Sequence, residues 1–199
     1  MEWKKAADYF TQALASSDPT PGGGAAAAQT GAMGAALLLM SVRTTLKRKN
    51  LTPQQLVALQ TGEERVARLQ ENLSNCVSND SKAYESYLQA KRLSKENFAR
   101  ESEMQNALEK AARVPADTAA TAVQTLEALE NLKPFIAPII LADVACAKHL
   151  LQAAIRCAVE NVRANIPFIQ NKELVEKLDK QAQLFLQSSQ GESYDRKSK

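Results

Sequence analysis

The chain contains a run without charged side chains that extends from Pro19 to Val42. It opens with Pro-Thr-Pro-Gly-Gly-Gly at residues 19–24 and continues as an Ala- and Leu-rich stretch. Prolines and glycines disfavour the interior of a helix, whereas alanine and leucine are strong helix formers. The pattern predicts a tight loop followed by a buried helix over residues 22–42. Thr20 is expected as its N-cap, and Pro21 as its first helical residue.

Small residues form a stripe along this predicted helix. Gly24, Ala27, Gly31 and Gly34 follow one another at spacings of 3, 4 and 3 residues, so they lie on one face. Such a face allows another helix to approach closely. The glycines at 22–24 have no Cβ and sit at the positive end of the helix, where their backbone N–H groups can approach a ligand.

Other interpretations of the run fit less well. A bilayer span needs about 20 apolar residues, but the first half of the run is Gly and Ala with Gln29 and Thr30. A signal peptide is disfavoured because Glu2, Asp8 and Asp18 precede the run. No Lys-Ser or Lys-Thr follows the glycines, so a phosphate-binding loop is not predicted. We expect no membrane association.

Composition argues against two further classes of function. The 25 basic and 22 acidic residues give a net charge of +3, and no basic block is interleaved with aromatics, so nucleic-acid binding is not predicted. Cys76, Cys146 and Cys157 have no paired spacing, which favours a reducing cytoplasm. Cys146 and His149 lie three residues apart on a predicted helix. They remain short of metal ligands because the chain has only 1 histidine, and we expect no metal.

Apolar residues recur with the helical period throughout the chain. We predict an all-α helical bundle with the Gly/Ala-rich helix at its centre, built as one domain over residues 1–190 and followed by a disordered polar tail at 191–199. Asn79-Asp80 is either a break or a polar point within one long helix. The predicted helices span residues 2–15, 22–42, 53–78, 96–113, 116–132, 139–165 and 172–187.

Three ordered motifs between Ser17 and Ile166 resemble those of the formimidoyltetrahydrofolate cyclodeaminase family, which includes stand-alone methenyltetrahydrofolate cyclohydrolases. The first is the loop and helix of residues 17–40. The second joins Asp80-Ser81-Lys82-Ala83-Tyr84 to Arg92-Leu93-Ser94-Lys95, and the third joins Asp143-Val144 to Asn161-Val162-Arg163 and Asn165. The resemblance implies a helical bundle that pairs into a homodimer and binds a reduced folate as substrate, with no separate cofactor.

The same resemblance implies roles for individual residues. It points to Asp80 as a proton-transfer carboxylate, to Lys95 as its charge-stabilising partner, and to Asp143 as a third catalytic residue. Alternatively, Asp80 caps the start of a helix after Asn79. The expected substrate-binding residues are Gly22, Gly23, Gly24, Arg92, Asn161, Arg163 and Asn165.

Three of these residues have plainer alternatives. Arg163 either binds the glutamate carboxylate of the folate or forms an exposed or intersubunit ion pair. Asn161 and Asn165 either bind substrate or satisfy buried backbone groups near Pro167.

Asp143 lies among apolar residues at 139–147, so we expect its carboxylate to be paired, hydrogen-bonded or shifted in pKa. It precedes Asn161 by 18 residues, a separation of about 27 Å along a helix. The two residues therefore bind opposite ends of an extended folate, or one acts in a neighbouring subunit's site, or one is structural.

The resemblance implies that the protein cyclises 5-formiminotetrahydrofolate to 5,10-methenyltetrahydrofolate and releases ammonia. The sequence departs from the family pattern at Ser94, where proline is usual, and at residues 137–142, which are apolar where an Asn-rich segment is usual. Two alternatives therefore stay open: a 5,10-methenyltetrahydrofolate cyclohydrolase, and a non-catalytic helical homodimer that keeps the fold.

Overall fold

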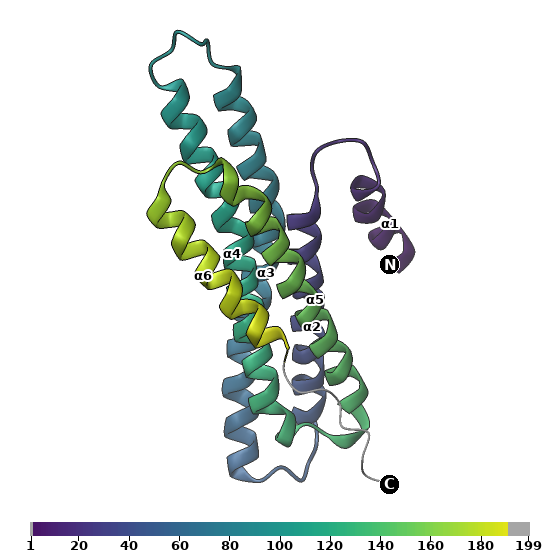
Figure 1. Ribbon diagram of the computed structural model, residues 1–199. Helices are drawn as coiled ribbons and strands as arrows, with labels where there is room; N and C mark the ends of the chain where they lie inside the picture. The colour runs from purple at the N-terminus through teal and green to yellow at the C-terminus, as the bar shows by residue number, and fades with distance from the viewer. Residues whose placement is uncertain (1, 191–199) are drawn as a thin grey trace.

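The computed structural model describes residues 2–190. Within this range the chain forms α-helices and short 3₁₀ turns and contains no strand, which confirms the predicted all-α class (Figure 1). The predicted tail at 191–199 lies outside the described residues. The helices are α1 (Trp3–Leu14), α2 (Gly23–Leu46), α3 (Pro53–Arg92), α4 (Arg100–Leu132), α5 (Leu141–Asn165) and α6 (Lys172–Ser189), with 3₁₀ turns η1 (Lys133–Phe135), η2 (Pro138–Ile140) and η3 (Ile166–Phe168).

Four long helices form the body of the molecule. α2 packs against α3 and α5, and α4 packs against the same two helices, so the four enclose a common core (Figure 1). α6 covers the seam between α4 and α5. The upper parts of α3 and α4 extend past the start of α2 as a two-helix projection (Figure 1).

The small residues of α2 explain how closely this bundle packs. A Cβ on Gly31 would lie 3.0 Å from Leu73 of α3 and 3.3 Å from Ala154 of α5. A Cβ on Gly34 would lie 2.9 Å from Leu151. These distances confirm that the stripe permits close helix approach, and they place its partners within the same chain.

Two predicted helix boundaries are wrong, one at the start of α2 and one within α4. α2 begins at Gly23 with Gly22 as its N-cap, so Thr20 and Pro21 precede the helix rather than starting it. The capping group is instead the side chain of Asp80, in α3. α4 continues through Pro115, where the sequence predicted the start of a new helix.

α3 resolves the question posed at Asn79-Asp80, because it is one continuous helix across that pair. It opens at a capping box in which the Thr52 hydroxyl accepts from the Gln55 backbone N–H and the Gln55 side chain accepts from the Thr52 N–H. Pro53 occupies the first helical position, as the sequence predicted.

α1 differs from the other helices because none of its residues is buried. It lies beside the bundle rather than within it (Figure 1), and its Trp3 and Tyr9 side chains are exposed.

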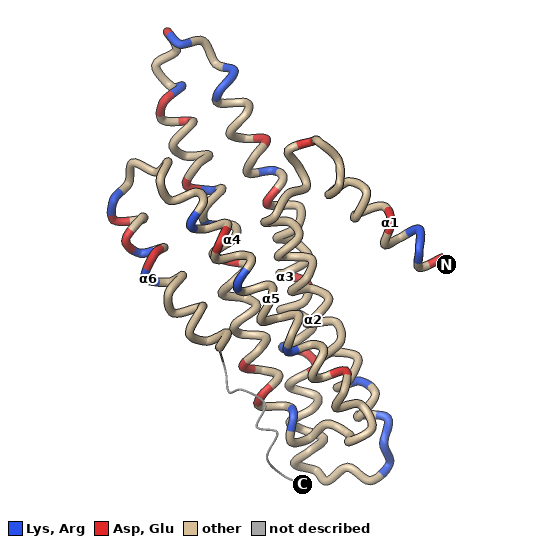
Figure 2. The backbone as a smooth tube through the Cα atoms, turned by 45° about the vertical axis from the view of Figure 1, so that its right-hand side comes forward, with Lys and Arg blue, Asp and Glu red and all other residues tan. Residues whose placement is uncertain are grey.

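Two segments are long and apolar enough to cross a membrane, α2 and the stretch from Pro138 to Phe168. In the most apolar window of α2, 61% of the residues are buried against the other helices, as in the core helix of a bundle. Charged residues are spread over α3, α4 and α6, whereas Arg43 is the only one in α2 (Figure 2).

Candidate active site

The Asp80 carboxylate of α3 caps the N-terminus of α2. The backbone N–H of Ala25, the third residue of α2, donates a hydrogen bond of 2.9 Å to Asp80 Oδ2. The first N–H groups of an α-helix have no partner within the helix, so a carboxylate is favoured at this end. Asp80 itself lies in the interior of α3, and the prediction that it caps the start of its own helix is wrong.

Glycines allow the carboxylate to come this close. A Cβ built on Gly24 would lie 2.0 Å from Asp80 Oδ1 and 2.6 Å from its Cγ, so a side chain at this position would displace the carboxylate. A Cβ on Gly23 would lie 3.2 Å from both the Nδ2 and Oδ1 atoms of Asn161. α2, α3 and α5 thus bring Gly23, Gly24, Asp80 and Asn161 to one place, although these residues are far apart in the sequence.

The electrostatic surroundings of Asp80 favour proton exchange. Burial raises the pKa of the Asp80 carboxyl above its usual range, and the hydrogen bond from Ala25 offsets part of this effect. A carboxyl with a raised pKa keeps its proton to a higher pH than an ordinary carboxyl, a property that general acids and bases use. The side chain is only half-buried, so a substrate can reach it.

Lys95 and Arg92 lie at the far end of α3, away from Asp80. Arg92 is the last residue of α3 and follows Asp80 by 12 residues, which is about 18 Å along the axis. Lys95 lies beyond it, in the connection to α4, and both side chains are exposed. Within one chain, the structure therefore does not bring Lys95 to the Asp80 carboxylate.

Asp143 lies in the first turn of α5 and is half-buried rather than enclosed. Its burial was predicted from its apolar neighbours, but Ile139 is 91% exposed and Leu141 is 39% exposed, so they do not cover it. A carboxylate in a first turn is favoured by the helix dipole. Asp143 and Asn161 belong to one continuous helix, and their separation of about 27 Å keeps Asp143 out of the Asp80 cluster.

The side chains of the two asparagines of α5 donate hydrogen bonds to backbone carbonyl groups. This was one of the two roles that the sequence left open for them. Asn161 Nδ2 donates to the Cys157 carbonyl at 2.8 Å while its side chain faces Gly23. Asn165 Nδ2 donates to the Ala111 carbonyl of α4 at 3.1 Å. This carbonyl would normally accept from residue 115, and Pro115 has no N–H to donate. Asn165 therefore supplies the missing donor that lets α4 continue.

Arg163 is exposed and forms an ion pair of 3.2 Å with Glu160, one turn earlier on α5. This geometry matches the plainer of its two sequence interpretations, the exposed ion pair. Gly22 lies next to the cluster, and a Cβ there would lie 3.5 Å from the Pro19 carbonyl, an ordinary contact.

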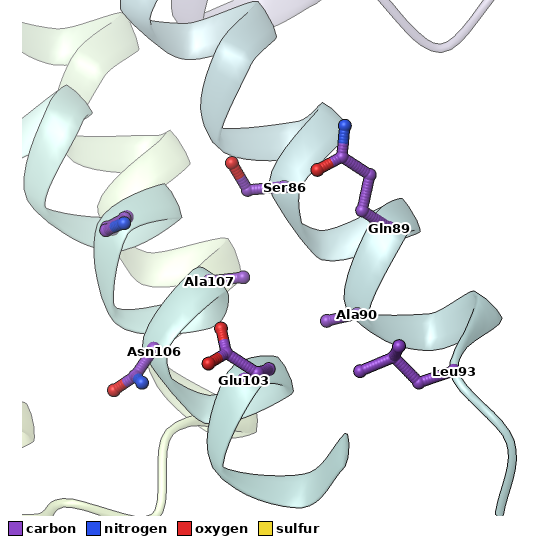
Figure 3. Close-up of a pocket in the computed structure, with 8 residues that line it drawn as sticks. Ser86, Gln89, Ala90, Leu93, Glu103, Asn106 and Ala107 are labelled. Carbon is purple, nitrogen blue, oxygen red and sulfur yellow. The ribbon is translucent and has the colours of Figure 1, made fainter. Parts of the chain in front are cut away.

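A cavity of about 320 Å³ lies between the projecting parts of α3 and α4 (Figure 3). Its lining contains none of the residues predicted for the site, and it faces the α4 side of α3. A groove of about 460 Å³ follows the same seam towards Cys76 and Asp117. Burial raises the pKa of both side chains. Among residues 2–190, no group of three or more His, Cys, Asp or Glu is placed to hold a metal ion.

Sequence reasoning missed the Ala25 N–H as the partner of Asp80 and the contact between Gly23 and Asn161. The run of three glycines was the only signal, because it shows that something approaches the start of α2 without showing what approaches.

The fold and the site define an all-α bundle that holds a half-buried carboxylate with a raised pKa at the N-terminus of its central helix. Residues 6–184 match the family described as formiminotransferase-cyclodeaminase. The chain is 30% identical over 173 residues to the methenyltetrahydrofolate cyclohydrolase of Methylorubrum extorquens, a match that covers 85% of this chain and 83% of that protein. The chain belongs to the formiminotransferase-cyclodeaminase family and is an enzyme of the cyclodeaminase or cyclohydrolase type.

A solved structure has the same fold. The formiminotetrahydrofolate cyclodeaminase of Thermotoga maritima matches with a TM-score of 0.75 and 26% sequence identity, over 96% of this chain and 94% of that one.

Proposed function

We propose that the protein binds a reduced folate and cyclises 5-formiminotetrahydrofolate to 5,10-methenyltetrahydrofolate with release of ammonia. The observation that carries this proposal is the Asp80 carboxyl, which is half-buried, has a raised pKa and lies at the N-terminus of α2. Family membership and the likeness to the Thermotoga cyclodeaminase support it.

In the proposed reaction, N10 of the substrate attacks the formimino carbon and forms a tetrahedral intermediate. The substrate enters with its formimino nitrogen protonated, as an amidinium ion, so this nitrogen carries two hydrogens in the intermediate. The Asp80 carboxylate takes the proton of N10 and delivers it to that nitrogen, which leaves as ammonia when its bond to carbon breaks. The positive charge stays on the methenyl product. Both nitrogens are bonded to the same carbon, so one carboxyl can serve them in turn. This single-carboxyl scheme suits a cluster in which the other expected groups, Lys95 and Asp143, lie far from Asp80.

The glycines of α2 complete the proposed site. Asp80 accepts from Ala25, and Gly23, which is exposed at the same helix end, has an N–H group that can donate to substrate. Gly24 is buried and leaves the space that the carboxylate occupies. Asn161 contributes a side-chain amide from α5. We further propose that the enzyme works as a homodimer in the cytoplasm, with the folate as its substrate and without a separate cofactor or metal.

A second candidate is the cyclohydrolase reaction, in which water attacks the methenyl carbon and a C–N bond opens. It is favoured by the Methylorubrum relative, which covers most of both chains. Asp80 would then take a proton from the attacking water and return it to the departing nitrogen, and the remaining hydroxyl proton would leave to solvent as the formyl C=O forms. A non-catalytic homodimer has less support, because the chain keeps a carboxyl whose surroundings suit proton transfer.

One assay separates these functions. The purified protein is mixed with 5-formiminotetrahydrofolate or with 5,10-methenyltetrahydrofolate, and the methenyl absorbance and free ammonia are followed against a protein-free control. A cyclodeaminase produces methenyl product and ammonia in equal amounts. A cyclohydrolase instead accelerates the loss of the methenyl compound. Absence of both activities, with no folate binding by calorimetry, would rule out the enzyme, and sedimentation of the same sample tests the dimer.

A further inference from the structure

Three residues continue the face of α3 on which Asp80 lies. Tyr84, Tyr87 and Lys91 follow Asp80 at spacings of 4, 3 and 4 residues, which place all four on one side of the helix. We call Tyr84, Tyr87 and Lys91 the α3 strip. Tyr87 and Lys91 belong to none of the motifs that pointed to the family.

The side chains of the strip contact one another. The rings of Tyr84 and Tyr87 have centroids 6.5 Å apart and are tilted by 44°. The Lys91 ammonium lies 5.9 Å from the centroid of the Tyr87 ring, within the range of a cation–π interaction. Side chains on a helix lean towards its N-terminus, so the charge of Lys91 lies back along α3 in the direction of Asp80. The strip thus presents two aromatic surfaces followed by a positive charge.

The strip lies beyond the end of the helix that covers the rest of this face. α2 begins at the level of Asp80, where Gly24 meets the carboxylate, while α3 continues for 12 more residues to Arg92 (Figure 1). α4 packs against a different side of α3, the side that carries Ser86 and Ala90 (Figure 3). Both tyrosines are half-buried and Lys91 is exposed. Basic residues also lie at the end of α3 (Figure 2).

We propose that the α3 strip binds the aminobenzoyl-glutamate arm of the reduced folate, with the aromatic ring against Tyr84 and Tyr87 and the glutamate carboxylates at Lys91. This inference rests on the proposed function and names how the same site holds its substrate. Tyr84, Tyr87 and Lys91 follow Asp80 at about 6, 10 and 16 Å along the axis.

The order of groups along α3 matches the order of groups along the substrate. N10 joins the pteridine to the arm, so a substrate that reacts at Asp80 has its aromatic ring next and its carboxylates last. A tyrosine ring provides a stacking surface for the aminobenzoyl ring, and an ammonium attracts the carboxylates. Arg92, the next residue, adds a second positive charge at this end of α3.

The test compares matched variants in steady-state kinetics and in fragment binding. The variants are Tyr87→Leu, Tyr87→Phe, Lys91→Met and, as a control on the opposite side of α3, Lys82→Met. We expect Tyr87→Leu to raise KM by at least about fivefold while kcat changes little, and Tyr87→Phe to behave like the wild type because the ring is retained. Lys91→Met should raise KM and reduce the salt dependence of KM, whereas Lys82→Met should change neither.

A fragment isolates the arm from the reacting centre. Free p-aminobenzoylglutamate should inhibit the wild type competitively, and inhibition should weaken in Tyr87→Leu and Lys91→Met. If Tyr87→Leu and Lys91→Met are active and show unchanged KM and unchanged inhibition, the proposal that the α3 strip binds the arm is wrong, while the proposed function still stands. A wild type that neither binds nor converts folate would overturn both. Circular dichroism of each variant checks that the helices are intact.

Discussion

Asp80 Oδ1 occupies the space beside Gly24 in which any other residue would place its Cβ, at a separation of 2.0 Å. The two positions are coupled, because the carboxylate can cap α2 only while residue 24 has no side chain. A glycine on one helix therefore determines the place of a carboxylate on another.

Gly24→Ala should reduce kcat at least about tenfold, because the new methyl group displaces the carboxylate from the Ala25 N–H and from the substrate. The rate is measured with the substrate that proves active, and the fraction of folded protein is measured by circular dichroism. Gly62→Ala is the matched control. Its Cβ would lie 2.4 Å from Leu132, also too close for a real Cβ, at a place in the bundle away from Asp80. Equal loss of activity per folded molecule in both variants would contradict the coupling.

Asp80→Asn should abolish turnover and keep the helix content, because the amide can still accept from Ala25 but cannot exchange the proton. Steady-state rates and far-ultraviolet circular dichroism measure the two effects. Activity close to that of the wild type would remove Asp80 from the mechanism.

The same variant should reveal the cost of the charge to stability. Burial raises the pKa of Asp80 in the folded chain above its ordinary value of 3.8. Between the ordinary and the raised pKa, the folded state binds more protons than the unfolded state, so the contribution of Asp80 to stability falls as pH rises. Asn does not titrate. The free energy of unfolding of Asp80→Asn relative to the wild type should therefore be higher at about pH 7 than at about pH 4, as measured by urea denaturation.

Asp143→Asn should retain kcat within about threefold, because Asp143 lies about 27 Å along α5 from the residue that faces Gly23. Loss of the favourable charge in the first turn should cost about 0.3–1 kcal/mol of stability. Kinetics and urea denaturation separate the two effects. A large fall in kcat with unchanged stability would instead place Asp143 in the site of a second subunit.

Asn165→Ala should destabilise the bundle by about 1–3 kcal/mol, because the Ala111 carbonyl loses its donor. The double variant Pro115→Ala, Asn165→Ala tests the cause. Alanine at 115 restores a backbone N–H for that carbonyl, so the loss of Asn165 should cost less in this background. Urea denaturation of the four proteins gives the coupling energy, and a coupling of zero would mean that Asn165 acts in another way.

The charge-free run and the helical period were sufficient to predict the bundle and its buried central helix. These features are local, because the helical recurrence of apolar residues and the spacing of Gly31 and Gly34 depend on neighbours within a few turns. The family motifs added the expectation that Asp80 acts on a folate. They did not show where Lys95 and Asp143 would lie relative to it.

Tertiary structure decided the start of α2, the continuity of α4 and the composition of the site. α2 starts at Gly23 because its cap is Asp80, which lies 55 residues from Ala25 in the sequence. α4 passes Pro115 because Asn165, 54 residues from Ala111, supplies a donor. The sequence alone determined which residues carry proton-exchanging and hydrogen-bonding groups. Which of them meet depended on helix packing, since partners on different helices have no fixed spacing in the sequence.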